Sequence, residues 1–222
     1  MRPMLVMLGF CVALATTPRE AGAGTVSGVV LREPAFNGNT KSVNRYRERS
    51  RRGAGEEEAA SCDCNPGLFA VVTLEGDGLK PAAPAVQPPT MAQKDRRFEP
   101  SVLAIPVGGL VSFPNEDPFF HNVFSYAKEQ SFDLGRYPQG ETHEVRFDTP
   151  GIIPVFCEIH YSMRAYIHVM ESPYFAVSDE ARRFEIPDVP PGDYTLRVWQ
   201  ENLPEIVQPV TVGPEPVRVE VR

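Results

Sequence analysis

Short runs in which apolar and polar residues alternate recur along the chain, and they predict β-strands. Alternation places apolar side chains on one face of a strand and polar side chains on the other. It is clearest in residues 194–199 and 217–222, where every second position is Tyr, Leu or Val. No long run has the period of a helix, and 23 Pro and 17 Gly supply turn residues. The pattern therefore predicts an all-β protein.

The first 23 residues have the pattern of a secretory signal peptide. Arg2 precedes an apolar stretch from Met4 to Ala15, and Ala21-Gly22-Ala23 offers a small-residue cleavage site, with Ala15 as an earlier alternative. No later apolar run approaches the ~20 residues that cross a bilayer. We therefore expect a periplasmic or secreted protein whose mature chain has no membrane span.

The net charge limits the class of partner. The chain carries 29 acidic and 22 basic residues, a formal charge of -7. This balance argues against nucleic acid as a partner. It is compatible both with attraction to a cationic protein and with ordinary solubility.

Three sulfur and nitrogen donors lie within one short segment. Cys157, His160 and Met163 are separated by two residues each, and a further imidazole, His121, lies upstream between an aromatic pair and a Val/Phe run. Two His and one Cys in a trigonal plane, with a weak axial Met, form a type 1 (blue) copper site. The thiolate and thioether favour Cu(I), and imidazoles hold either oxidation state. We expect one copper ion, bound by all four side chains.

The other two histidines do not join this set. His143 and His168 both lie in alternating runs, so they are interpreted as ordinary strand residues. Enzymes with several copper centres need further histidines. The four ligands also leave the metal no obvious open position for a substrate. We therefore expect an electron carrier rather than an enzyme.

The ligand spacing and its surroundings resemble the cupredoxins, and the short ligand loop is most similar to that of amicyanin. The resemblance covers residues 91–170, including the runs 107–115 and 149–157. It implies a Greek-key β-sandwich that carries single electrons to or from a redox partner protein, such as a dehydrogenase, a cytochrome or an oxidase.

The resemblance also implies roles for neighbouring residues. Asn122 would tie the two ligand segments together and place a backbone amide near the thiolate. Aromatic side chains would exclude water from the metal, and an apolar patch would expose the edge of His160 to the partner. The residues implied are Phe113, Phe119, Phe120, Phe124 and Phe156 for the aromatic shell, and Ile159 and Tyr161 for the patch.

The two ends of the chain resemble parts of one carboxypeptidase-regulatory-like domain, a second small β-sandwich. Residues 24–76 are similar to its first strands and residues 171–222 to the remainder. Either end alone would leave unpaired edges, so we expect the copper domain to be inserted in, or joined to, this sandwich. Residues 77–90 form a Pro-rich linker. Residues 33–66 are predicted to be a disordered, charged loop.

Three features keep more than one interpretation. Cys62 and Cys64 could be bridged to each other, bridged between molecules, or bind a second metal ion. Trp199 could cover a contact between domains or be exposed. The alternatives to electron transfer are a periplasmic copper-binding or delivery module, which Cys157 disfavours, and a structural exoprotein, which would leave the ligand set unexplained.

Overall fold

Two β-sandwiches make up the part of the chain that a computed structural model describes, which is residues 22–32, 68–77, 79 and 82–222. No α-helix occurs in these residues, so the all-β prediction is confirmed. The described residues contain no helix that is long and apolar enough to cross a bilayer. Two predicted segments lie outside the described residues: residues 1–21 of the signal peptide, and the charged loop at 33–66 with Cys62 and Cys64.

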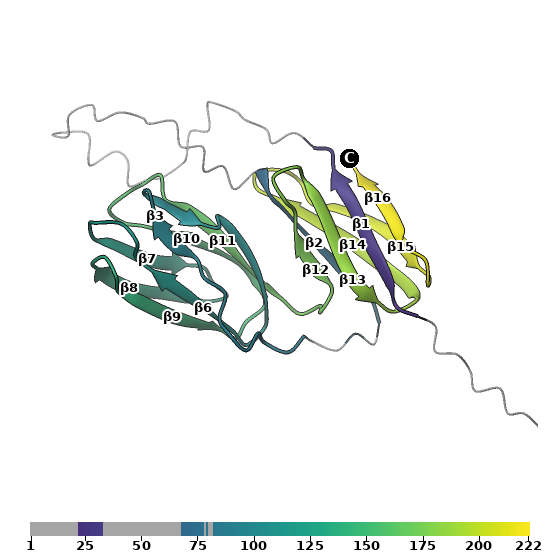
Figure 1. Cartoon of the computed structure of the whole chain (residues 1–222), viewed down its shortest axis with the longest axis horizontal. Coiled ribbons are helices and arrows are strands. Elements are labelled where there is room, and N and C mark those ends of the chain that lie inside the picture. The colour runs from purple at the N-terminus through teal and green to yellow at the C-terminus, as the bar shows by residue number, and fades with distance from the viewer. Residues whose placement is uncertain (1–21, 33–67, 78, 80–81) are drawn as a thin grey trace, which may run out of the picture.

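The first sandwich, in teal and green in Figure 1, spans the middle of the chain. Its main sheet has the order β5-β11-β10-β7-β8, in which β11 pairs parallel with β5 and antiparallel with β10. The pairs β6-β9 and β3-β4 lie opposite, joined by bridges from Thr90 and Gln93. Its strands are β3 (Ala92–Lys94), β4 (Arg97–Glu99), β5 (Val102–Pro106), β6 (Gly109–Pro114), β7 (His121–Tyr126), β8 (Ser131–Tyr137), β9 (Thr142–Phe147), β10 (Gly151–Phe156) and β11 (Arg164–Met170).

The second sandwich is built from both ends of the chain. A three-stranded sheet, β13-β1-β16, faces a four-stranded sheet, β12-β2-β14-β15. The purple β1 lies beside the yellow β16 in Figure 1, and the two strands pair in parallel. The strands are β1 (Gly24–Val30), β2 (Ala70–Glu75), β12 (Phe175–Val177), β13 (Arg183–Val189), β14 (Gly192–Gln200), β15 (Ile206–Val212) and β16 (Val217–Val221).

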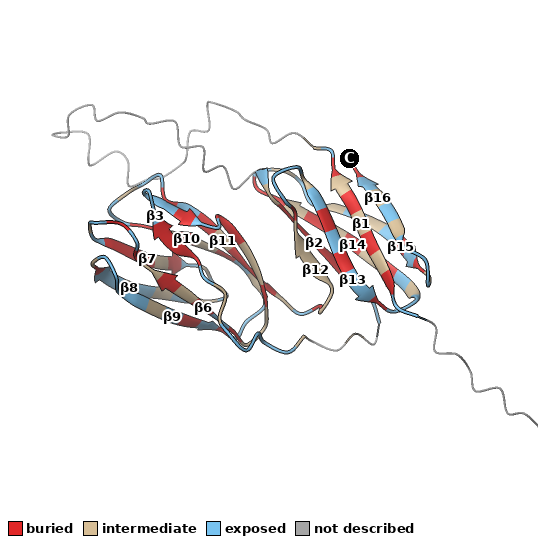
Figure 2. Cartoon of the chain, viewed as in Figure 1, coloured by how far each residue is buried: buried red, intermediate tan, exposed pale blue. Residues whose placement is uncertain are grey.

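Each sandwich has its own apolar core, as the red strand faces in Figure 2 show. In β14 the alternation seen in the sequence becomes alternation of burial: Tyr194, Leu196 and Val198 are buried, and the residues between them are partly exposed. Close strand approach also restricts residue type. A Cβ on Gly28 of β1 would lie 2.3 Å from the Val219 carbonyl oxygen of β16, so glycine is required there.

The two sandwiches contact each other through β11 and β14. The Trp199 ring packs on Tyr166 and His168, with ring centroids 5.1 and 4.3 Å apart. The Tyr166 hydroxyl donates a 2.8 Å hydrogen bond to the buried Glu201 carboxylate, which also pairs with Arg164 at 3.2 Å. Trp199 therefore covers a contact between domains. Because β11 begins directly after the predicted ligand loop, this contact holds the strand that supports the loop.

Candidate metal centre

One tight loop between two paired strands carries three of the predicted ligands. β10 ends at Phe156 and β11 begins at Arg164, and these two residues are antiparallel partners. Two backbone hydrogen bonds close the loop: Cys157 N–H donates to the Met163 carbonyl at 3.3 Å, and Met163 N–H donates to the His160 carbonyl at 3.0 Å. The positions of the ligands are thus set by backbone pairing on both sides.

His121 comes from a different part of the same sheet. It is the first residue of β7, and β7 pairs with β10 next to the loop, at Phe124 and Phe156. The His121 side chain is completely buried. The sheet therefore brings His121 beside a loop that lies 36 residues later in the chain.

The ligand atoms of His121, Cys157 and His160 converge. The two Nδ1 atoms are 3.0 Å apart, and Cys157 Sγ lies 3.7 Å from His121 Nδ1. All three ligand atoms lie within 4.8 Å of one another. Metal–nitrogen bonds of about 2.0–2.1 Å and a metal–sulfur bond of about 2.3 Å give separations of about 3.3–3.8 Å at tetrahedral to trigonal angles. The separation of Cys157 Sγ and His121 Nδ1 falls in this range, and the two Nδ1 atoms are slightly closer together, so the cluster is close to the size that a transition-metal ion requires.

Met163 is buried next to this triangle. It is 1% exposed and belongs to the same core cluster as Cys157. Its backbone bonds to both His160 and Cys157 keep it on the ligand loop. A thioether on this loop is the type of weak ligand that a soft metal ion accepts.

Asn122 links the two ligand segments. Its side-chain Oδ1 accepts a 2.6 Å hydrogen bond from the backbone N–H of Glu158, the residue after the cysteine.

Burial alone would raise the pKa of Cys157. The hydrogen bond with His121 and the backbone N–H groups of Asn122, His160 and Ile159 outweigh burial and lower that pKa, which favours the thiolate.

Asp117 contacts the candidate site, and the sequence analysis did not predict it. Its Oδ2 lies 2.7 Å from His121 Nε2, the ring nitrogen that faces away from the triangle. Burial disfavours the charged ring, but the bonds to Cys157 and Asp117 outweigh it and raise the pKa of His121. The signal in the sequence was an acidic residue four positions before the histidine, in a segment otherwise rich in Phe and Pro.

Aromatic residues cover one side of the two imidazoles. The Phe119 ring centroid lies 5.2 Å from that of His121 and 5.6 Å from that of His160. The Arg96 guanidinium lies over the Phe119 ring, 5.3 Å from its centroid. Phe119 is one of the aromatic residues that the resemblance implies. Of the others, Phe113 is completely buried, and Phe156 is partly buried against Phe124.

Large apolar side chains are exposed near His160. Tyr161 is 77% exposed, Phe120 54% and Ile159 37%. His160 itself is only partly buried, whereas His121 and Cys157 are almost completely covered. Burial, then the charges of His121 and Arg96, lower the pKa of His160, so its ring is neutral and can bind a metal ion. His160 is therefore the ligand nearest the surface.

The two remaining histidines lie outside this cluster. His143 is on β9 with a partly exposed side chain, 3.8 Å from the Glu141 carboxylate. His168 is on β11, buried against Trp199.

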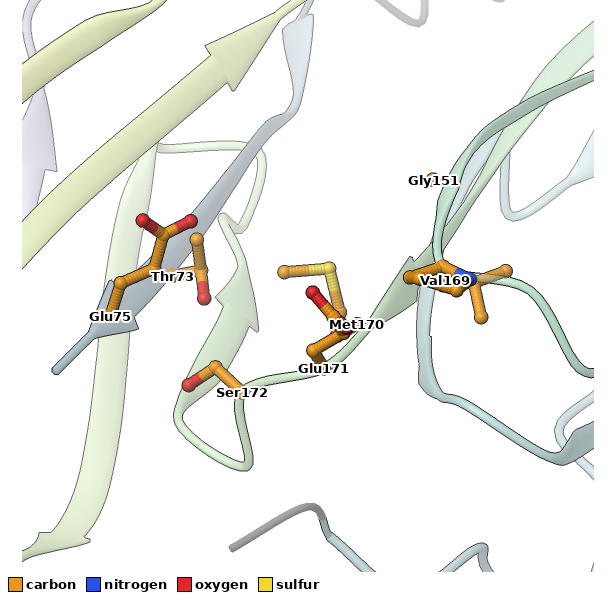
Figure 3. A pocket seen from close by; sticks show the side chains of 8 residues that line it. Thr73, Glu75, Gly151, Val169, Met170, Glu171 and Ser172 are labelled. Carbon is orange, nitrogen blue, oxygen red and sulfur yellow. The ribbon is translucent and has the colours of Figure 1, made fainter. Parts of the chain in front are cut away.

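A hollow of about 400 Å³ lies between the sandwiches, at the other end of β11 (Figure 3). Thr73, Glu75 and Ser172 lie on one side and Gly151 and Val169 on the other, with Met170 between them. Met170 is separated from Met163 by the length of β11, about 20 Å for a strand of seven residues. The hollow is therefore separate from the metal centre.

Three solved structures illustrate what this chain is similar to. A Cu-containing nitrite reductase (NirK) from Thermus scotoductus SA-01 is 30% identical over 41% of this chain, with a TM-score of 0.37. A reduced Cu(I) form of an amicyanin variant is 20% identical over 45% of this chain (TM-score 0.36), and a purple cupredoxin from Nitrosopumilus maritimus is 21% identical over 37% (TM-score 0.34).

The share of these proteins that is covered differs. The match spans 25% of the nitrite reductase but 98% of amicyanin and 99% of the purple cupredoxin. No family model matches this chain, and neither does any curated protein.

Proposed function

We propose that this chain binds one type 1 copper ion and carries single electrons between redox partners. The observation that carries the proposal is the triangle of His121 Nδ1, His160 Nδ1 and Cys157 Sγ, buried at one end of the first sandwich. Met163 is the proposed axial ligand. Two imidazoles, a thiolate and a thioether form the donor set that copper accepts in both oxidation states.

The protein supplies a rigid ligand frame. Copper would provide the one-electron couple, which is what this donor set is suited to. The loop is closed by its own backbone hydrogen bonds, and Asn122 ties it to the strand that carries His121. A frame held on both sides changes little when the charge of the bound ion changes, which keeps the energy of reorganisation small.

The partly exposed His160 is the proposed route for the electron. Ile159 and Tyr161 lie beside it as exposed apolar side chains on which a partner protein can dock. We propose a dehydrogenase, a cytochrome or an oxidase as partner, in the periplasm or outside the cell, on the basis of the signal-like residues 1–23. The second sandwich, proposed to be carboxypeptidase-regulatory-like, would be a scaffold that holds β11.

The test is the visible spectrum of the copper-loaded, oxidised protein. We expect an intense thiolate-to-copper band that dithionite removes, and one copper per chain. The Cys157→Ser variant should lose the band, whereas His143→Ala, a histidine replacement on a partly exposed strand position, should keep it. Met163→Leu should keep the band and shift the reduction potential.

Three results would refute the proposal. A Cys157→Ser variant that stayed coloured would show that the ligand assignment is wrong. A colourless wild-type protein that still bound copper would instead favour a copper-delivery module, and a protein that bound no copper would favour a structural role.

A further inference from the structure

The His121 ring is held from behind by a carboxylate that is itself held by the backbone. Asp117 Oδ2 contacts His121 Nε2 at 2.7 Å, and both side chains are almost completely buried, at 7% and 0% exposure. Asp117 is therefore shielded from the solvent that would otherwise screen its charge. A ring nitrogen that donates to a carboxylate leaves the opposite nitrogen, here Nδ1, as the ligand atom.

A tight turn between β3 and β4 anchors this carboxylate. Asp95 N–H donates to Asp117 Oδ1 at 2.7 Å, and Arg96 N–H donates to Oδ2 at 2.9 Å. Both turn residues have left-handed backbones, with φ of 52° and 58°, and this geometry points successive N–H groups to the same side. The Asp117 backbone N–H in turn donates to Asn115 Oδ1 at 3.0 Å.

These contacts leave Asp117 little freedom. Three donors, two from the turn and one from the histidine, meet its two oxygens, so the carboxylate stays ionised and in place. An ionised, buried and fixed carboxylate beside a metal ligand acts on the metal through that ligand.

We propose that Asp117 is a positioning residue that selects His121 Nδ1 as the ligand atom and stabilises the oxidised ion relative to the reduced one. The proposal rests on the proposed copper site. The physical reason is charge: Cu(II) carries one more positive charge than Cu(I), so a buried negative charge near it favours Cu(II). A carboxylate acceptor also makes the imidazole a stronger donor, which acts in the same direction.

The test compares the reduction potentials of the wild-type protein, Asp117→Asn and Glu116→Gln. Glu116 is the neighbouring carboxylate, about half exposed and paired with Lys94 at 3.5 Å, so its variant removes an equal charge without touching His121. Asp117→Asn should shift the Cu(II)/Cu(I) equilibrium towards Cu(I) by about tenfold to a hundredfold. Glu116→Gln should change it by less than about twofold, because exposed charges are screened.

A second measurement uses the unaltered chain, in case Asp117→Asn does not fold. Nitrogen NMR of the diamagnetic Cu(I) protein should show the His121 Nε2 atom protonated, with a proton that exchanges slowly with water. An unprotonated or rapidly exchanging Nε2 would overturn the role of Asp117. So would a Cu(II)/Cu(I) equilibrium in Asp117→Asn that differs from that of the wild type by less than about twofold. A wild-type protein without the thiolate band would instead refute the copper site itself, so the two failures differ.

Discussion

Acidification should weaken the fold through one histidine at the contact between the sandwiches. His168 is 4% exposed, and its Nε2 has no hydrogen-bond partner among the described residues. Its ring packs on Trp199, and no carboxylate of the described part of the chain forms an ion pair with it. Burial lowers the pKa of His168 to about 3, so the native protein holds this ring neutral. The nearest charges line a small cavity beside it, where Arg197 is already bridged to Glu75 and Glu205.

The sign and size of the effect follow from proton linkage. The unfolded chain protonates His168 below about pH 6.5, whereas the native chain does so only near pH 3. Stability is therefore complete above pH 6.5 and is lost as the pH falls, by about 1.4 kcal/mol for each pH unit. Between pH 7 and pH 5 the loss from this residue is about 2 kcal/mol, and at pH 3 it reaches about 4 kcal/mol.

The measurement is urea unfolding of the metal-free protein at pH 7 and pH 5, followed by the fluorescence of Trp199. This residue is the only tryptophan of the chain and lies on the His168 ring. The comparison is with His168→Leu, which removes the titrating group but keeps an apolar side chain in the contact. His143→Leu is the control for a histidine replaced at a partly exposed position.

The wild type and the control should each lose about 2 kcal/mol more than His168→Leu on acidification. His121 and His160 are present in all three proteins, so their contribution cancels in the comparison. If His168→Leu loses as much stability between pH 7 and pH 5 as the wild type, the buried neutral imidazole is not the cause and the reasoning is wrong.

The contact between the sandwiches and the core of the second one give two further predictions. Tyr166→Phe removes the donor to the buried Glu201 carboxylate and should lower the free energy of unfolding by about 1.5–3 kcal/mol, whereas Tyr161→Phe, on the exposed apolar surface, should change it by less than about 0.5 kcal/mol. Leu74→Ala, at a completely buried position, should cost about 2–5 kcal/mol in urea unfolding, and the exposed Val207→Ala should cost far less. If the two variants of either pair lower the free energy of unfolding equally, the difference in burial on which that prediction depends is contradicted.

Part of the fold could be predicted because strand patterns are local. The alternation at Tyr194, Leu196 and Val198 predicted which side chains of β14 are buried, since side chains on a strand point to opposite faces. The same alternation could not decide what Trp199 contacts. Its partners Tyr166 and His168 lie about thirty residues earlier, on a strand of the other sandwich, and only the packing of two sheets brings them together.

The residues of the candidate site also differ in how far the sequence could predict them. Cys157, His160 and Met163 were visible in the sequence because one short loop must place them near one another, whatever the rest of the chain does. Asp117 was not visible as part of the site, because its position depends on a turn at residues 95 and 96 whose N–H groups hold its carboxylate against His121. A side chain that acts through long-range hydrogen bonds has no local pattern that marks it.

The sequence by itself thus determined the strand class, the tight ligand loop and the chemical type of the donors, since these depend on residue type and spacing over a few positions. The tertiary structure decided that His121 meets that loop, that Asp117 holds His121 from behind, and that Trp199 joins the two sandwiches. These contacts connect residues far apart in the chain, and their geometry is set by sheet pairing and core packing, which no short stretch of sequence contains.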